Sequence, residues 1–450
     1  TRTYSAFQDD VDRFARALIA MGVKRGDHVA IWATNVPQWY ITFWAATKIG
    51  AVLVTVNTAY KIHEAEYLLR QSDTHTLVMI DGFKDSDYVG IIKELCPELK
   101  ESEPGNLHSK RLPVLRNIIT VDSERPGCYT WEEAQVLADS VPQSEVEARR
   151  RSIDKHDVCN MQYTSGTTGF PKGVMLTHYN VVNNGKAIGD CMDLSTADRM
   201  MIQVPMFHCF GMVLAMTASM THGTTMCPIT AFSPRKGLHC INRERITGFQ
   251  GVPTRFIAML EHPDFAKTDF SYMRTGIMAG SPCPVKVMQD VVEKMHMPEI
   301  CITYGQTEAS PGCTMSKTTD SLDVRVNTVG GEMFGVSCKI VDPETGEDLP
   351  DDMDGEFVAK GYNIMKGDYK MPESTAAAGE KDGWLRPGDL ARRTPEGNYK
   401  TTGRIKDMII RGGENIYPKE IEDFIYTHPK VKDVQVIGVP DEQYGEEIMA

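Results

Sequence analysis

Strand-like and helix-like segments alternate along the first 80 residues of the chain, and this alternation limits the folds that it can adopt. Residues 28–32 (HVAIW) form a short apolar run that predicts a buried strand, and residues 51–54 and 74–80 predict two more. Apolar residues at helical spacing predict helices over 37–50 and 62–72. Strands that alternate with helices are typical of βαβ units on a mostly parallel sheet. The sequence therefore predicts an α/β fold.

The length of the chain and its later segments predict more than one domain. A chain of 450 residues exceeds what one hydrophobic core usually holds. We expect a second α/β stretch from Asp157 to about residue 325, and then an antiparallel, barrel-like segment over 337–361. A boundary is expected at 397–407, followed by a helix over 418–428 and a strand over 433–439.

The expected fold class is α/β with two domains of unequal size. Residues 1–403 would form a large N-terminal domain of two βαβ-type sheets plus the barrel-like β segment. Residues 404–450 would form the start of a small, truncated α+β C-terminal domain.

Composition excludes several classes of protein. The formal net charge is 48 − 61 = −13, which argues against a non-specific nucleic-acid binder. The eleven cysteines are dispersed, with no two within eleven residues of each other, so C-x-x-C metal or redox sites are excluded. A dispersed, odd number of cysteines favours free thiols and a cytoplasmic location. No apolar run reaches the roughly 18–20 residues of a membrane span.

Residues 164–173 (TSGTTGFPKG) carry the strongest chemical signal. Glycines allow backbone N–H groups to approach an anion closely, while hydroxyls and a lysine add donors and positive charge. The spacing differs from the G-x-x-x-x-G-K-[ST] phosphate loop, because Gly173 stands where Ser or Thr should follow the lysine. The alternative is a plain connector. The candidate anion-binding residues are Thr164, Ser165, Gly166, Thr167, Thr168, Gly169 and Lys172.

The order of these ten residues resembles the signature of the adenylate-forming superfamily, which includes acyl-CoA synthetases, amino-acid adenylation domains and firefly-luciferase-like enzymes. The resemblance predicts further motifs in a fixed order, and the chain contains them. They are AGSPCP (279–284), YGQTE (304–308), GEFVAKG (355–361), WLRPGDL (384–390) and GRIKDMIIRGGENIYPKEIE (403–422). Within the superfamily, the chain is most similar in appearance to medium- and long-chain fatty-acyl-CoA synthetases.

The resemblance implies roles for single residues around ATP. Tyr304 would stack on adenine, Thr307 would bond a phosphate, and Glu308 would hold Mg²⁺. Asp389 would accept hydrogen bonds from the ribose hydroxyls, and Arg404 would contact ribose. Further nucleotide contacts are expected at Gly280, Ser281, Pro282 and Gly305.

The implied chemistry has two steps. A carboxylate attacks the α-phosphate of ATP and expels pyrophosphate, and the acyl-adenylate then reacts with the thiol of coenzyme A. Lys172, Thr307, Glu308 and Lys406 are the expected catalytic residues, with Lys406 as the hinge between the steps. Gly412 and Gly413 would line the pantetheine passage. ATP, Mg²⁺ and coenzyme A are the expected cofactor and co-substrates.

The acid is expected to be apolar. Amino-acid-activating relatives carry an Asp where this chain has His208, so a substrate ammonium group would have no counter-ion. A packed histidine is the alternative. Met212, Met216 and Met220 could line an acyl pocket or belong to the core. The candidate substrate-binding residues are His208, Phe210, Gly211, Gly251 and Val252.

The chain departs from the family at its C-terminal end. Family members carry a C-terminal lysine that assists adenylate formation, but only 46 residues follow Arg404 and none forms such a motif. The strand at 433–439 would also have no partner, so we expect a fragment of a longer enzyme.

Other functions remain open at this point. They are an adenylation enzyme that loads a carrier protein, a luciferase-like oxygenase, and an inactive nucleotide-binding module. A homo-oligomer also remains open, whereas no nucleic-acid partner and no transmembrane segment are expected.

Overall fold

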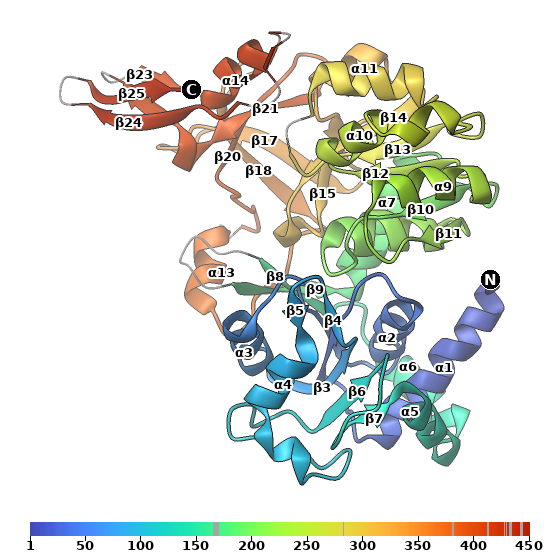
Figure 1. The fold of residues 1–450 in the computed structure, drawn as a ribbon. Helices are drawn as coiled ribbons and strands as arrows, with labels where there is room; N and C mark the ends of the chain where they lie inside the picture. The colour runs from blue at the N-terminus through green and yellow to red at the C-terminus, as the bar shows by residue number, and fades with distance from the viewer. Residues whose placement is uncertain are drawn as a thin grey trace.

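The computed structural model has three main parts (Figure 1). In Figure 1 the N-terminal part lies at the bottom, a second α/β part at the upper right, and the C-terminal strands at the upper left. The structure describes residues 1–164, 171–281, 283–379, 382–411, 414–426, 428, 430–431, 434–441 and 444–450.

The first sheet has eight strands in the order β19-β9-β8-β2-β1-β3-β6-β7. Its six strands from β8 to β7 are parallel to one another, while β9 and β19 are antiparallel to their neighbours. The strands are β1 (His28–Trp32), β2 (Val52–Thr55), β3 (Thr74–Met79), β6 (Asn117–Thr120), β7 (Tyr129–Thr130), β8 (Val158–Thr164), β9 (Lys172–Thr177) and β19 (Gly367–Asp368). The helices of this part are α1 (Tyr4–Ala20), α2 (Pro37–Lys48), α3 (Ile62–Gln71), α4 (Tyr88–Leu95), α5 (Trp131–Leu137) and α6 (Gln143–Ser152).

The second sheet has seven strands in the order β11-β10-β12-β13-β14-β15-β16, the first five parallel. The strands are β10 (Arg199–Ile202), β11 (Thr225–Pro228), β12 (Gly248–Gly251), β13 (Thr275–Met278), β14 (Glu299–Gly305), β15 (Gly312–Met315) and β16 (Gly331–Glu332). The helices are α7 (His178–Cys191), the π-helix η3 (Phe210–Thr217), α8 (Ala218–Thr221), α9 (Pro234–Glu244), α10 (Pro253–Leu260), α11 (Val285–Lys294) and α12 (Leu322–Asn327), with the short 3-10 turn η5 (Thr307–Ala309).

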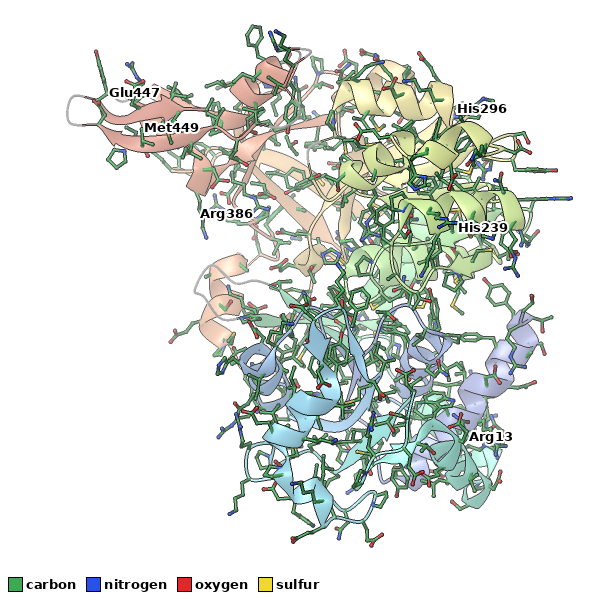
Figure 2. All side chains as sticks on the ribbon, viewed as in Figure 1. Arg13, His239, His296, Arg386, Glu447 and Met449 are labelled. Carbon is green, nitrogen blue, oxygen red and sulfur yellow. The ribbon has the colours of Figure 1, made fainter. Side chains whose placement is uncertain are left out.

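Two antiparallel sheets follow. The first has the order β17-β18-β20-β21 and the second the order β23-β22-β25-β24. Their strands are β17 (Val336–Val341), β18 (Gly355–Gly361), β20 (Asp389–Arg393), β21 (Tyr399–Arg404), β22 (Ile409–Arg411), β23 (Glu414–Ile416), β24 (Ile437–Asp441) and β25 (Gly445–Met449). The associated turns and helices are α13 (Pro372–Ala378), η6 (Ile405–Asp407) and α14 (Pro418–Tyr426). In Figure 2 Glu447 and Met449 mark the projecting C-terminal hairpin, away from His239 and His296 on the second α/β part.

Most expected elements of the first part are confirmed, but the boundary between the two sheets is not. The strand predicted over 28–32 is β1, and the helices predicted over 37–50 and 62–72 are α2 and α3. The prediction that the second α/β stretch begins near Asp157 is wrong, because β8 and β9 belong to the first sheet. Strand β8 pairs in parallel with β2 and is followed by the hairpin partner β9, so both strands complete the first sheet.

The expected lack of a partner for the last predicted strand is also wrong. Strand β24 pairs antiparallel with β25 over five residue pairs, from Ile437↔Met449 to Asp441↔Gly445. The prediction failed because the two short strands pair with each other, and the sequence of one strand alone does not show its partner.

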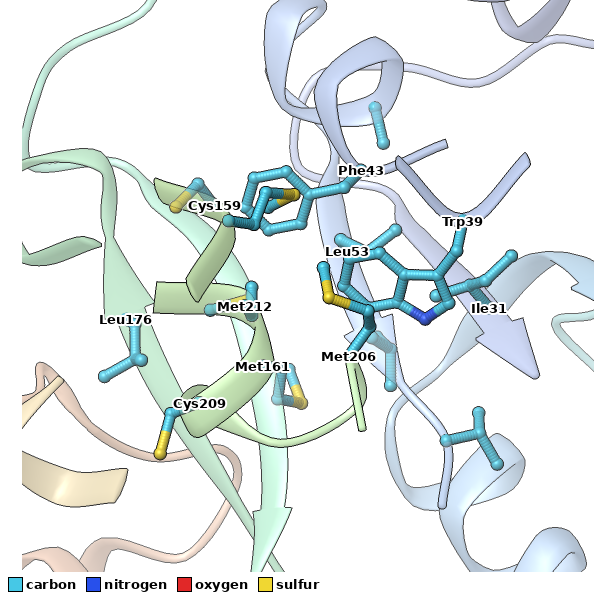
Figure 3. Close-up of a cluster of buried hydrophobic side chains, with 14 of the residues drawn as sticks. Ile31, Trp39, Phe43, Leu53, Cys159, Met161, Leu176, Met206, Cys209 and Met212 are labelled. Carbon is cyan, nitrogen blue, oxygen red and sulfur yellow. The ribbon is translucent and has the colours of Figure 1, made fainter. Parts of the chain in front are cut away.

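A shared hydrophobic cluster joins the first sheet to the segment around η3 (Figure 3). Phe43 of α2 and Leu53 of β2 lie on one side of the close-up. The Gln162 amide of β8 contacts the sulfur of Met212 in η3 at 3.5 Å. Met212 and Met216 are fully buried in this cluster, so they pack as core residues. Met220 lines a surface groove of about 720 Å³ that contains none of the candidate site residues.

No helix among the residues that the structure describes is both long enough and apolar enough to cross a membrane. All eleven cysteines are unpaired, as their dispersed spacing predicted.

We predict that Phe43→Ala destabilises the protein by about 3–5 kcal/mol, because Phe43 is 1% exposed and its loss leaves a cavity in the shared cluster. Val136→Ala is the control, since Val136 is 63% exposed on α5 and its truncation should change stability by less than about 0.5 kcal/mol. Thermal and urea unfolding of both variants measure the difference. Equal stability of the two variants would contradict the importance of this cluster.

Candidate active site

Asp389 joins two motifs that are far apart in the sequence. Tyr304, near the end of β14, donates a hydrogen bond from its hydroxyl to Asp389 Oδ2 at 2.6 Å. Arg404 Nε lies 3.1 Å from Asp389 Oδ1. Arg404 is also the cross-strand neighbour of Asp389 in the β20–β21 pair. The structure therefore brings three of the expected nucleotide-binding residues together.

The protonation of Tyr304 is fixed by its surroundings. Burial, followed by the nearby Asp389 carboxylate, raises the pKa of Tyr304 well above its ordinary value. The hydroxyl consequently keeps its proton at neutral pH and acts as a donor to Asp389. Phe357 packs edge-on against the Tyr304 ring, with the ring centroids 4.8 Å apart. This aromatic contact holds the ring in place and was not predicted, because the sequence alone does not pair β18 with β14.

Turn η5 presents Thr307 and Glu308 beside this cluster. Thr307 is buried, and its Oγ1 lies 3.7 Å from the Sγ of Cys209. Burial raises the pKa of Glu308, the carboxylate of Asp368 adds to the rise, and Lys172 opposes it. Lys172 of β9 and the η5 residues Thr307 and Glu308 therefore come from two separate segments and lie in one region.

The chain needs glycine at Gly305, directly after Tyr304. A Cβ there would lie 1.8 Å from the carbonyl oxygen of Pro311, closer than two atoms can approach. Gly305 therefore lets the return strand β15 pass close to β14, which sets the position of η5.

The stem of the TSGTTGFPKG loop is held by helix α3. Thr164 ends β8 and pairs with Lys172, the first residue of β9. The hydroxyl of Tyr67 donates to the carbonyl oxygen of Pro171 at 3.1 Å. Gln71, one turn further along α3, contacts the Tyr163 hydroxyl. The residues of the loop itself, Ser165, Gly166, Thr167, Thr168 and Gly169, lie outside the described residues.

The candidate acid-binding residues form an adjacent apolar group. A Cβ placed on Gly280 would lie 3.1 Å from Val252 Cγ1 and 3.8 Å from Phe210 Cε1, so these three residues are neighbours. Gly251 ends β12 directly before Val252. Gly211 packs tightly, since a Cβ there would lie 2.3 Å from the Pro205 carbonyl oxygen.

His208 lies at the start of the same segment and is exposed. Its Nδ1 accepts a hydrogen bond from the Phe210 backbone N–H at 3.1 Å, so the proton of the neutral ring is on Nε2. The alternative of a packed core histidine is therefore not supported, because the residue is exposed.

The remaining predicted residues fall near the edges of the site or outside the described part. Ser281 is exposed beside Gly280, and Lys406 is exposed in η6. Pro282, Gly412 and Gly413 lie outside the described residues. The sequence analysis did not predict the contacts of Tyr67 and Gln71. In the sequence these residues are a polar pair on one face of a predicted helix, a pattern that is common on helices of any function.

Comparison with known proteins identifies the class to which this fold and site belong. The family model for AMP-binding enzymes matches residues 1–369, and the model for the AMP-binding enzyme C-terminal domain matches residues 420–450. The chain therefore belongs to the AMP-binding enzyme family.

Relatives define the branch of the family. The chain is 51% identical over 449 residues to YngI of Bacillus subtilis, provisionally named an acyl-CoA synthetase, covering 100% of this chain and 82% of that protein. It is 40% identical over 455 residues to the mitochondrial medium-chain acyl-CoA ligase ACSF2 of Bos taurus, covering 100% of this chain and 74% of that protein. These relatives and the family indicate an AMP-forming CoA ligase.

A solved structure confirms the fold. The ATP-bound structure of MatB from Rhodopseudomonas palustris has a TM-score of 0.83 and 28% identity, and the match covers 99% of this chain and 82% of that chain. The α/β fold with a small C-terminal domain is therefore that of the adenylate-forming enzymes.

We predict that Tyr67→Phe raises the KM for ATP by about 2- to 10-fold, because it removes one hydrogen bond that anchors the loop stem at Pro171. Tyr88→Phe is the matched control, since it removes a comparable bond to the carbonyl oxygen of Thr58, away from the loop. Steady-state kinetics and thermal unfolding of both variants distinguish the roles. If the two variants change the KM equally, α3 does not position the loop.

Proposed function

We propose that the chain converts an apolar carboxylic acid to an acyl-adenylate with ATP and then transfers the acyl group to coenzyme A. The observation that carries the proposal is the neighbouring arrangement of Phe210, Val252 and Gly280 beside the convergent Lys172, Thr307 and Glu308. ACSF2 is named a medium-chain acyl-CoA ligase, which supports an aliphatic acid of that kind.

The polar residues would bind ATP in a fixed orientation. Asp389 is already held by Tyr304 and Arg404, so its carboxylate is oriented before the ribose hydroxyls arrive. Lys172 and the Thr307 hydroxyl would contact the phosphates, where negative charge increases as pyrophosphate leaves. Thr164, Gly280, Ser281 and Gly305 would complete this binding surface. The same assignment includes the loop residues that lie outside the described part.

Mg²⁺ fits the donors present. Mg²⁺ prefers oxygen ligands and is usually held by one or two carboxylates together with substrate phosphates. Glu308 provides such a carboxylate, whereas no group of three or more metal-ligating side chains occurs among the described residues. The ion would supply positive charge to the phosphates, and Glu308 would keep it beside Lys172 and Thr307.

The apolar group predicts which acids are accepted. Among the described residues, no carboxylate contacts His208, so an amino-acid ammonium group beside it would have no counter-ion. We predict that medium-chain fatty acids stimulate ATP–pyrophosphate exchange at least tenfold more than any amino acid. Exchange measured over a panel of fatty, aromatic and amino acids tests this. An amino acid as the best substrate would contradict the proposal.

We also propose that residues 1–403 and 404–450 are separate domains and that Lys406 is the hinge between two arrangements. Lys406 is exposed in the short turn η6, with β21 ending before it and β22 beginning after it. A hinge residue must change its φ and ψ angles, which proline prevents.

We predict that Lys406→Pro slows one half-reaction at least tenfold more than the other, because it favours one arrangement. Lys406→Ala is the control, since it removes the side chain and leaves the backbone free. Pyrophosphate exchange and thioester formation from a pre-formed acyl-adenylate are measured separately. Equal slowing of both steps by proline would show that Lys406 is not the hinge.

A further inference from the structure

Asp368 is a buried carboxylate near Glu308 that belongs to none of the motifs identified in the sequence. Its side chain is on the two-residue strand β19, and the residue is 5% exposed. The Ser374 hydroxyl donates to Asp368 Oδ2, but Oδ1 has no hydrogen-bond partner among the residues that the structure describes. A buried carboxylate oxygen without a partner is costly, so its retention points to a ligand that is bound during function.

The sheet register directs Asp368 toward the candidate phosphate region. Asp368 lies opposite Val174 in the antiparallel β9–β19 pair. Directly opposed residues share a face of a sheet, and so do residues two apart on one strand. Asp368 and Lys172 therefore lie on the same face, as diagonal neighbours at a typical backbone separation of roughly 7–8 Å.

The same face of β9 turns toward η5. Leu176 continues the alternation from Lys172 and Val174, and Figure 3 shows its side chain on the side of Cys209. Cys209 in turn lies 3.7 Å from the Thr307 hydroxyl of η5. Strand β9 packs against η5. The carboxylates of Asp368 and Glu308 thus approach the same region from different elements.

The backbone before β19 is fixed to this region by several hydrogen bonds. The Met365 N–H donates to the carbonyl oxygen of Glu308 at 2.8 Å. The Ser310 hydroxyl donates to the Asn363 carbonyl oxygen at 2.6 Å, and Asn180 donates to the Ile364 carbonyl oxygen at 3.1 Å. Because these bonds come from both sides of the segment, the position of Asp368 relative to Glu308 is set by the fold.

The charges agree with the geometry. Burial raises the pKa of Glu308 most strongly, and the Asp368 carboxylate raises it further, whereas a backbone hydrogen bond and Lys172 lower it. Two neighbouring carboxylates repel each other in a site of low polarity. A divalent cation between them removes the repulsion and satisfies Asp368 Oδ1.

We propose that Asp368 supplies a second carboxylate oxygen, Oδ1, to the divalent cation that accompanies ATP, with Glu308 supplying the first. Two carboxylates with phosphate oxygens and water form an ordinary six-oxygen Mg²⁺ shell. The inference rests on the proposed use of ATP at this site, and it does not depend on the identity of the acid or the thiol.

The experiment measures Mn²⁺ as a spectroscopic substitute for Mg²⁺. Free Mn²⁺ is titrated by electron paramagnetic resonance in the presence of the protein and α,β-methylene-ATP, with no acid and no thiol. Asp368→Asn is expected to weaken Mn²⁺ binding about 10- to 100-fold, the range found when a group that serves a metal site is removed. Glu308→Gln is expected to weaken it at least as much. In the double variant the losses should be less than additive, because both residues serve one ion.

Ser374→Ala is the matched control, since it removes a hydrogen bond to Asp368 and keeps both carboxylates. Its Mn²⁺ affinity should stay within about 2-fold of the unmodified protein, because both proposed metal-binding carboxylates remain and Ser374 contacts Oδ2, not Oδ1. Thermal unfolding without nucleotide reports any purely structural role. If Asp368→Asn lowers the melting temperature but leaves the Mn²⁺ affinity unchanged, the role of Asp368 is purely structural and the inference is overturned.

Two further outcomes are separable. If Asp368→Asn fails to fold, Asp368→Glu keeps the charge and displaces the carboxylate by one methylene, and unchanged Mn²⁺ affinity in that variant overturns the inference. If neither Glu308→Gln nor Asp368→Asn changes Mn²⁺ affinity, the proposed nucleotide site itself is wrong. If only Glu308→Gln weakens Mn²⁺ binding, the nucleotide site is supported and the proposed role of Asp368 is wrong.

Discussion

The interaction on which the site depends is the position of Asp389 between Tyr304 and Arg404. Tyr304 belongs to the second α/β sheet, and Asp389 and Arg404 belong to the antiparallel sheet that follows it. One hydrogen bond and one ion pair to the same carboxylate fix the relative position of these sheets at the place where the motifs meet. The side chain of Asp389 is 15% exposed and that of Arg404 is 70% exposed, so the buried hydrogen bond from Tyr304 holds the carboxylate more firmly than the solvent-facing ion pair does.

The second constraint is the accumulation of charge beside η5. Asp368, Asp389 and Lys172 each act electrostatically on Glu308, and burial of Glu308 strengthens these interactions. Such a site is electrostatically unfavourable when empty and becomes favourable when phosphates and a divalent cation bind. A preorganised arrangement of this kind stabilises the charge that develops during phosphoryl displacement, because the protein groups need little rearrangement.

The sequence predicts the motif residues and the local elements better than it predicts how the sheets are joined. The prediction for β1 succeeds because HVAIW is short, apolar and bounded by turns. The placement of β8 and β9 fails because a strand's neighbours depend on contacts with β2, about one hundred residues earlier in the chain. The position of Asp368 near the candidate site was not predicted for the same reason, because it depends on the pairing of β19 with β9 and not on the neighbouring residues in the sequence. The roles of the site residues themselves stay predictions, because they were inferred from the resemblance to the adenylate-forming superfamily.

The backbone between the two proposed domains explains how motion could occur without loss of the nucleotide contacts. The β20–β21 ladder ends at the Asp389↔Arg404 pair, and the next ladder begins at Ile409. Only residues 405–408 lie between the two ladders, and the Ile405 N–H is still bonded to the Gly388 carbonyl oxygen at 2.9 Å. Rotation after Ile405 would therefore break none of the strand pairings between described residues and would leave Arg404 on Asp389. If Asp389 and Arg404 bind ribose as proposed, a turn placed directly after them would allow the small domain to exchange the groups around the adenylate while the nucleotide remains bound.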